Sequence, residues 1–323
     1  MTEPIRPVLV TGMPRSATSW VGMMLAASGR FVYVNEPLNP SHPPGHSPGI
    51  LRAEVEHAFQ YISEENDAAW LDPFRDTLRL RYHHMAELRR NRSRYDLAKM
   101  AKYSWHFTAG RVRRRVALLD DPYAVLSAGW FARRLGCQVV VMLRDPVAIV
   151  GSWKRLGWTF DLGRLLIQPA LRRDWLGPFE AAMAAPSARC DDLIGNVSLL
   201  WRLIYHVVGE VQAEVPEIRL VRHEDLSADP VLAFARLYGS LGLELTPTVE
   251  QTIMDFTSSG QQVTSHSWTI SRHGISRTGA RRLDSRANLE AWKQRLTLDE
   301  VARVRELTAD VASRFYPVEP ETM

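Results

Sequence analysis

The segment from residue 7 to residue 20, PVLVTGMPRSATSW, constrains the fold of this chain more than any other. An apolar run typical of a buried strand leads through a short loop into a helical pattern. This connection directs free backbone N–H groups and the positive end of a helix dipole at one point. Further donors come from Arg15, Ser16, Thr18 and Ser19. The segment therefore predicts an α/β fold whose first loop binds a multiply charged anion such as a nucleotide phosphate.

This loop differs from the Walker A pattern GxxxxGK[ST] of nucleoside triphosphatases. Gly12 and Ser19 have the expected spacing, but Ala17 and Thr18 stand where the pattern has glycine and lysine. The missing lysine would contact the outer phosphates, and Arg15 is the only cation in the loop. The loop therefore favours anion binding over ordinary ATP chemistry. A strand–turn–helix unit without a ligand is the alternative.

Short apolar runs and helical patterns alternate along the chain, which indicates a P-loop-type doubly wound parallel sheet flanked by helices. We expect strands at 7–11, 31–34, 116–119, 138–143 and 218–221, and helices at 18–28, 122–134, 146–155 and 230–241. In such sheets ligands bind beyond the carboxyl ends of the strands. No linker is evident, so we expect a single domain over 1–323. Helical insertions at 39–110 and 156–215 are expected to form the side that binds the second substrate.

Composition narrows the possible ligands. The net charge of +4 suits an anionic ligand but is too small to indicate nucleic-acid binding. Two cysteines among 323 residues argue against a disulfide framework and a cysteine–histidine metal site, so no metal is expected. No signal-peptide pattern and no apolar run of membrane-spanning length is found, which predicts a soluble cytoplasmic protein without a membrane span.

A second strand–helix junction lies at 139–153, VVVMLRDPVAIVGSW. Arg144 ends the predicted strand, and Ser152 follows eight residues later, so that both can face one cleft. A guanidinium and a hydroxyl in this arrangement form a second anion pocket. The alternative is that Arg-Asp-Pro serves only as a helix cap. Together with the first loop, the junction indicates a ligand with phosphates at two separated positions.

These two segments resemble the sulfotransferases that use 3′-phosphoadenosine 5′-phosphosulfate (PAPS), and most closely the bacterial and carbohydrate O-sulfotransferases. Residues 14–20 are similar to the family's 5′-phosphosulfate loop in its Arg-Ser-Gly form, and 143–152 to its 3′-phosphate motif. A late Arg/Lys-Gly loop of the family is matched in residue type by Arg277 and Gly279. The resemblance implies the following cofactor-binding residues: Arg15, Ser16, Ala17, Thr18, Ser19, Trp20, Arg144, Ser152, Arg277 and Gly279.

Other family landmarks follow in order along the chain. Residues 31–38 are similar to the Glu-Pro segment of carbohydrate 6-O-sulfotransferases, 221–230 to the Arg-Tyr-Glu-Asp-Leu…Asp-Pro landmark, and 291–293 to the late tryptophan segment. Two departures stand out. Ala17 replaces the usual loop glycine, and residues 120–122, Asp-Asp-Pro, stand where bacterial relatives commonly have Lys-Asp-Pro.

The resemblance implies metal-independent transfer of a sulfuryl group from PAPS to a hydroxyl of a carbohydrate or other small acceptor (EC 2.8.2.-). Such a transfer needs charge stabilisation, which we assign to the loop and Arg15, and a base for the acceptor proton. Glu36, at the end of a predicted strand, is the candidate base; pairing with a loop arginine is its alternative role. His106 is the second candidate base. Glu224 and Asp225 are expected to hold Arg222 or a nearby helix N-terminus rather than to act in catalysis.

Two other functions remain open. One is a P-loop kinase, against which stand the missing lysine and the lack of an Asp-containing strand end placed to hold magnesium. The other is a non-catalytic nucleotide-binding module, against which stands a carboxylate, Glu36, beside the anion loop. The identity of the acceptor and the oligomeric state are not predicted by the sequence.

Overall fold

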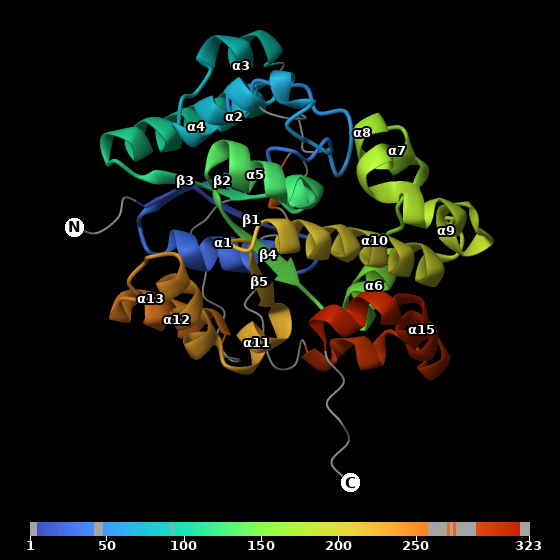
Figure 1. Cartoon of the computed structure of the whole chain (residues 1–323). Coiled ribbons are helices and arrows are strands. Elements are labelled where there is room, and N and C mark those ends of the chain that lie inside the picture. The colour runs from blue at the N-terminus through green and yellow to red at the C-terminus, as the bar shows by residue number, and fades with distance from the viewer. Residues whose placement is uncertain are drawn as a thin grey trace.

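Five parallel strands form the centre of the computed structural model (Figure 1). The structure describes residues 5–41, 48–91, 93–257 and 289–316, together with the backbone of 270–271 and 274–275. The strands of the sheet occur in the order β2-β3-β1-β4-β5. Their bounds are β1 Val8–Gly12, β2 Phe31–Asn35, β3 Val116–Asp120, β4 Gln138–Leu143 and β5 Arg219–Arg222; a separate antiparallel pair is formed by β6 Ile270–Ser271 and β7 Gly274–Ile275.

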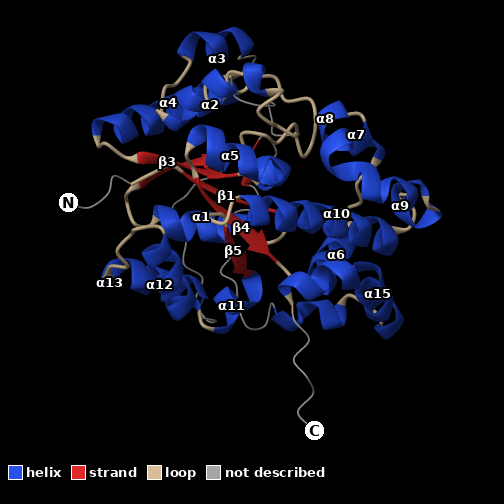
Figure 2. Cartoon of the chain, viewed as in Figure 1, coloured by secondary structure: helices blue, strands red, loops and turns tan. Residues whose placement is uncertain are grey.

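Helices surround the sheet on both faces (Figure 2). The α-helices are α1 Thr18–Ala26, α2 Leu71–Leu78, α3 His84–Arg90, α4 Arg94–Val112, α5 Ala128–Leu135, α6 Pro146–Leu156, α7 Gly163–Leu166, α8 Pro169–Leu171, α9 Glu180–Ala184, α10 Leu193–Glu214, α11 His223–Ala228, α12 Pro230–Ser240, α13 Pro247–Thr257 and α15 Leu298–Phe315. Shorter helical turns are η1 Asp67–Ala69, η2 Pro122–Ser127, η3 Arg172–Leu176, η4 Gly177–Phe179, η5 Pro186–Ala188 and η6 Ala291–Gln294.

Successive side chains of a strand point to opposite faces of the sheet, and helices cover both faces, so the side chains on both faces are buried. Leu9 of β1 and Val141 of β4 belong to one core, which α5 and α10 cover. Val10 and Met142, one residue further along each strand, belong to a second core under α1 and α12. The continuous apolar runs in the sequence reflect this double burial, and the predicted doubly wound parallel sheet is confirmed.

An aspartate followed by a proline starts three of the helical elements. In each pair the aspartate side chain accepts hydrogen bonds from the first turn, while proline occupies a position where no N–H is needed. The pairs are Asp121–Pro122 before η2, Asp145–Pro146 before α6 and Asp229–Pro230 before α12. This pattern explains why the predicted starts of these elements agree with the structure.

The predicted boundaries differ from the structure mainly at 122–134. The sequence predicts one helix there, whereas the chain forms the 3₁₀ segment η2 before α5 begins at Ala128. In the part of the chain that the structure describes, no helix is both long and apolar enough to cross a bilayer.

Candidate functional site

The loop between β1 and α1 is tightly constrained at its two ends. Gly12 has a φ of 147°, and a Cβ there would lie 2.6 Å from the carbonyl oxygen of Met142, so only glycine fits. Arg15 and Ala17 also have left-handed φ values, 80° and 76°. Such conformations cost about 1 kcal/mol or more for residues with a Cβ and cluster at binding sites.

Side chains from β4 and α6 hold the carbonyl groups of this loop. Trp153 Nε1 donates to the oxygen of Pro14 at 3.0 Å, and Arg144 Nη1 donates to the oxygen of Arg15 at 2.8 Å. The loop carbonyls are thereby turned toward β4 and α6. At the other side of the loop α1 begins at Thr18 without a side-chain cap. The N-terminal end of α1 is therefore available to an anion.

Buried donors without partners surround the same loop. Within the described residues, Ser16 Oγ, Arg144 Nε and Trp20 Nε1 are buried and lack a hydrogen-bond partner. Ser16 is 0% and Arg144 only 5% exposed, and burial lowers the pKa of Arg144 to about 10. Unsatisfied buried donors are costly and rare in native proteins. A bound anion would satisfy the hydroxyl and the guanidinium, so these residues fit a phosphate-bearing ligand.

The structure brings the two predicted anion motifs into direct contact. Arg15 Nε lies 3.2 Å from Ser152 Oγ, across 137 positions of sequence. Ser152 is buried on α6, whereas the Arg15 side chain is exposed. One ligand can therefore contact the loop and the α6 motif together.

The carboxylates near Arg144 support the backbone. The Asp145 side chain caps α6, and its backbone N–H donates to Glu224 Oε1 at 3.0 Å. Tyr316 donates to the other oxygen of Glu224 at 3.2 Å. Asp225 pairs with Arg222 at 2.7 Å. These contacts agree with positioning roles for Glu224 and Asp225.

Glu36 lies directly after β2, which is an edge strand of the sheet and is separated from β4 by β3 and β1. Its carboxylate accepts a 2.6 Å hydrogen bond from Asn39 Nδ2, and it forms no ion pair within the described residues. Burial raises the pKa of the Glu36 carboxyl, and the nearby Asp120 charge adds to this effect. The charge of Glu36 in turn raises the pKa of Tyr103 and Tyr123. Glu36 thus lies within electrostatic reach of a carboxylate and two phenols, and it forms no ion pair with Arg15.

Asp120 corrects one expectation drawn from the sequence. It ends β3, which pairs directly with β1, and is completely buried. Tyr33 donates to one of its oxygens, and Thr18 and Ser19 at the start of α1 lie close enough to favour its ionised form. An aspartate does therefore end a strand beside the anion loop, contrary to the prediction. Burial nevertheless raises the pKa of Asp120, and its other oxygen has no partner within the described residues.

The remaining predicted site residues lie at several places. Trp20 is buried in α1 and packs edge-on against Phe234, with ring centroids 5.5 Å apart. His106 is exposed on α4, and partial burial of its ring together with Lys102 lowers its pKa. Arg277 and Gly279 lie outside the described residues.

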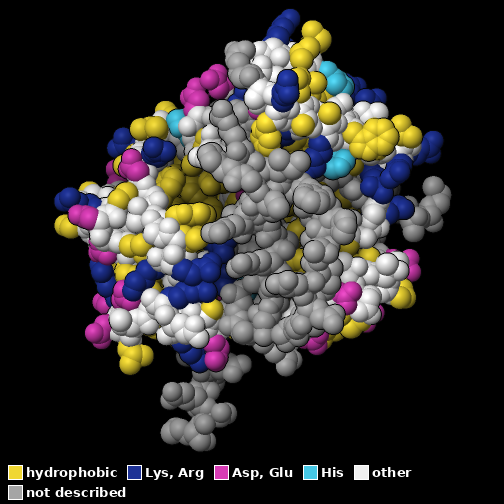
Figure 3. Space-filling view, turned by 180° about the vertical axis from the view of Figure 1, so that it is seen from behind, with side chains coloured by type: hydrophobic (Ala, Val, Ile, Leu, Met, Phe, Trp, Pro, Cys, Tyr) yellow, Lys and Arg dark blue, Asp and Glu magenta, His cyan; other side chains and the backbone are white. Residues whose placement is uncertain are grey.

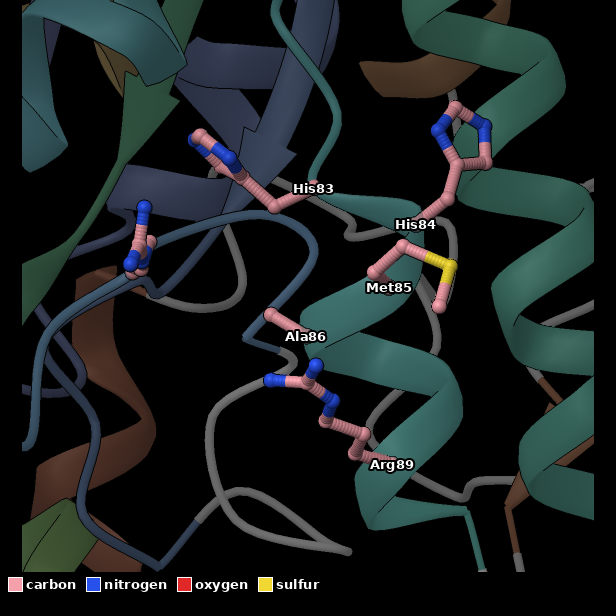
Figure 4. Close-up of a pocket in the computed structure, with 6 residues that line it drawn as sticks. His83, His84, Met85, Ala86 and Arg89 are labelled. Carbon is pink, nitrogen blue, oxygen red and sulfur yellow. The ribbon is translucent and has the colours of Figure 1, made fainter.

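A separate surface cavity of about 420 Å³ adjoins the start of α3 (Figure 4). None of the predicted site residues lines it. Its lining consists of Arg52, His83, His84, Met85, Ala86 and Arg89.

Taken together, the parallel sheet and the loop that leads from β1 into α1 define a P-loop-type α/β protein. A model of the sulfotransferase family matches residues 7–247, which include both anion motifs. This match covers more than half of the chain, and the chain belongs to the sulfotransferase family.

Two of the relatives that the chain matches are named sulfotransferases. The chain is 34% identical over 194 residues to carbohydrate sulfotransferase 2 of Mus musculus, covering 53% of this chain and 33% of that protein. It is 26% identical over 204 residues to carbohydrate sulfotransferase 1 of Homo sapiens, covering 62% and 40%. The chain therefore spans two fifths or less of the length of these relatives. The sulfotransferase domain from the curacin biosynthetic pathway is 12% identical, with a TM-score of 0.49 over 99% of this chain and 100% of that chain.

Proposed function

We propose that this protein transfers a sulfuryl group from PAPS to a hydroxyl group of a carbohydrate or another small acceptor. The observation that carries the proposal is the pair of joined anion motifs, in which Arg15 Nε lies 3.2 Å from Ser152 Oγ. PAPS carries anionic groups at both its 5′ and its 3′ positions, which suits a site of two linked parts. The curated relatives are named carbohydrate sulfotransferases, which supports a carbohydrate acceptor.

In this proposal the loop and the N-terminal end of α1 hold the 5′-phosphosulfate, while Arg144 and Ser152 hold the 3′-phosphate. The acceptor oxygen forms a new S–O bond, the S–O bond to the 5′-phosphate breaks, and 3′,5′-ADP leaves. Negative charge then grows on the leaving phosphate. Arg15, Thr18 and Ser19 offset this charge, because donors aimed at a developing charge stabilise the transition state.

Glu36 is the proposed base that accepts the acceptor proton. Partial burial keeps water away from its carboxylate and raises its pKa, which makes it a stronger base. Its lack of an ion pair within the described residues favours this role over pairing with a loop arginine. His106 is the second candidate, and its exposed position on α4 makes it the weaker one. The segments 39–110 and 156–215 are proposed to form the acceptor side.

A P-loop kinase is the second candidate function, and Asp120 is the observation that favours it. In P-loop enzymes an aspartate at such a strand end helps to hold magnesium beside the loop hydroxyl. The absence of the Walker A lysine and the presence of the Arg144–Ser152 motif favour sulfuryl transfer instead. The test is incubation of the protein with PAPS and a panel of hydroxyl acceptors, with 3′,5′-ADP release measured. Release that depends on an acceptor supports the proposal, and phosphoryl transfer from ATP to the same panel contradicts it.

A further inference from the structure

Two arginines next to the α6 motif lack the counter-charges that other cations in this part of the fold possess. Lys154 pairs with Glu300 at 2.6 Å, and Arg305 pairs with Asp145 at 2.7 Å. Arg155, next to Lys154 on α6, forms no ion pair or side-chain hydrogen bond within the described residues, and the same holds for Arg295. Two cations left unpaired beside paired neighbours indicate a place for an anion.

The geometry of α6 places Arg155 beside Ser152, the serine whose hydroxyl is proposed to bind the 3′-phosphate. Arg155 lies three residues after Ser152 on α6, so both side chains share one face of the helix. Ser152 is buried and Arg155 is exposed, so this face leads from the interior to the surface.

Close packing of η6 against α6 brings Arg295 to the same place. A Cβ on Gly151 would lie 3.3 Å from the Cβ of Trp292 and 3.6 Å from Leu296 Cδ1. Gly151 precedes Ser152, and Arg295 lies between Trp292 and Leu296 in sequence. The missing side chain of Gly151 favours this close approach, which sets the half-buried Arg295 next to the α6 motif.

The positive charges of Arg155 and Arg295 affect the pKa values of the arginines in the two predicted anion motifs. Although the Arg15 side chain reaches the surface, partial burial of its guanidinium lowers its pKa, and the positive charges of Arg155 and Arg295 lower it further. Arg295 also lowers the pKa of Arg144. Figure 3 shows Lys and Arg side chains gathered on the side of the molecule that carries α6 and α15. Like charges held this close repel one another, and a multiply charged anion relieves the repulsion.

We propose that Arg155 and Arg295 bind the 3′-phosphate of the donor nucleotide together with Arg144 and Ser152, and so select nucleotides that carry this phosphate. The inference rests on the proposed function. Two of these contacts come from β4 and α6 and are buried, whereas Arg155 and Arg295 approach from the surface. The surface pair closes the phosphate site on the side where solvent would otherwise reach it.

The test is calorimetric titration of the full chain and its Arg155→Ala and Arg295→Ala variants with 3′,5′-ADP and with 5′-AMP, which lacks the 3′-phosphate. A charge-assisted hydrogen bond typically corresponds to tenfold or more in affinity. We expect each variant to lose about tenfold in affinity for 3′,5′-ADP and to bind 5′-AMP almost unchanged. Arg155→Lys and Arg295→Lys should recover part of the loss.

Arg133→Ala is the matched control, since Arg133 lies on α5 and faces Glu64 and Glu214. It removes the same charge from the protein and should leave both affinities unchanged. Equal losses for both nucleotides, or unchanged 3′,5′-ADP binding in both alanine variants, would overturn the inference. Failure of the proposed function would differ, because the unmodified protein would then not prefer 3′,5′-ADP over 5′-AMP.

Discussion

Arg144 Nη1 donates a 2.8 Å hydrogen bond to the carbonyl oxygen of Arg15, which fixes the end of β4 to the anion loop after β1. The same guanidinium has a buried Nε without a partner among the described residues. Arg144 therefore positions the loop and has a second donor that is free for the proposed nucleotide.

Replacing Arg144 by alanine should weaken binding of 3′,5′-ADP by at least about 30-fold, since loss of one partner of a buried charge pair typically costs about 2–5 kcal/mol. Ser152→Ala removes a single hydroxyl and should cost less. Isothermal titration measures both. Arg144→Lys keeps the charge but loses the planar guanidinium, so its affinity for 3′,5′-ADP should lie between that of Arg144→Ala and that of the unmodified protein. Normal 3′,5′-ADP binding by Arg144→Ala would leave Arg144 only the role of positioning the loop through the carbonyl oxygen of Arg15.

Glu36→Gln should lower turnover by roughly 10²- to 10⁴-fold, the usual contribution of a general base, and leave 3′,5′-ADP affinity nearly intact. Glutamine keeps the size of the side chain and its contact with Asn39 but cannot accept the proton. His106→Gln serves as the comparison and should retain most activity. Full turnover in Glu36→Gln would remove Glu36 from the mechanism and leave His106 as the candidate.

The pH dependence follows from the raised pKa of Glu36. The ionised carboxylate is the active form, so kcat/KM should fall as the pH falls through this pKa. Because burial raises the pKa, the fall should begin above the ordinary carboxyl value of about 4.3. The pH profile of the Glu36→Gln variant should lack this acidic limb. An identical limb in the variant would assign it to another group.

Ala17→Gly should leave the free energy of unfolding unchanged or raise it by up to about 1 kcal/mol, because Ala17 occupies the left-handed region where glycine is not strained. Ala101→Gly is the matched control. Ala101 is exposed in the middle of α4, so glycine there should lower stability by roughly 0.5–1 kcal/mol. Urea unfolding distinguishes the two. Equal destabilisation by both substitutions would contradict the account of strain in the loop.

The sequence predicts the strands and helix starts well, and the contacts between distant segments less well. The strands and most helix starts follow from apolar runs and from Asp-Pro pairs, because these signals act within a few residues. The contact of Trp153 Nε1 with Pro14 spans 139 positions, and nothing near either residue indicates it. In the sequence Trp153 resembles an ordinary core tryptophan or a stacking platform, whereas in the structure it holds the loop.

Asp120 shows the same limit for the site. Asp120 lies beside α1 because β3 pairs with β1. The residues of a strand do not indicate which other strand it pairs with. Arg155 and Arg295 likewise depend on the packing of η6 against Gly151. By contrast, Arg15 and Arg144 follow strand ends and Ser152 lies on the helix directly after Arg144, so the sequence spacing alone allows their proximity to be anticipated.

The most direct test of the account is a comparison of thermal stabilisation by 3′,5′-ADP, ADP and ATP, each with and without magnesium. The account predicts that 3′,5′-ADP stabilises the protein without magnesium and more than ADP does, because it engages both anion motifs. At about 100 times its Kd it should add about 2.7 kcal/mol to the free energy of unfolding. Equal or greater stabilisation by ATP with magnesium would contradict the account and favour a kinase in which Asp120 helps to hold the metal.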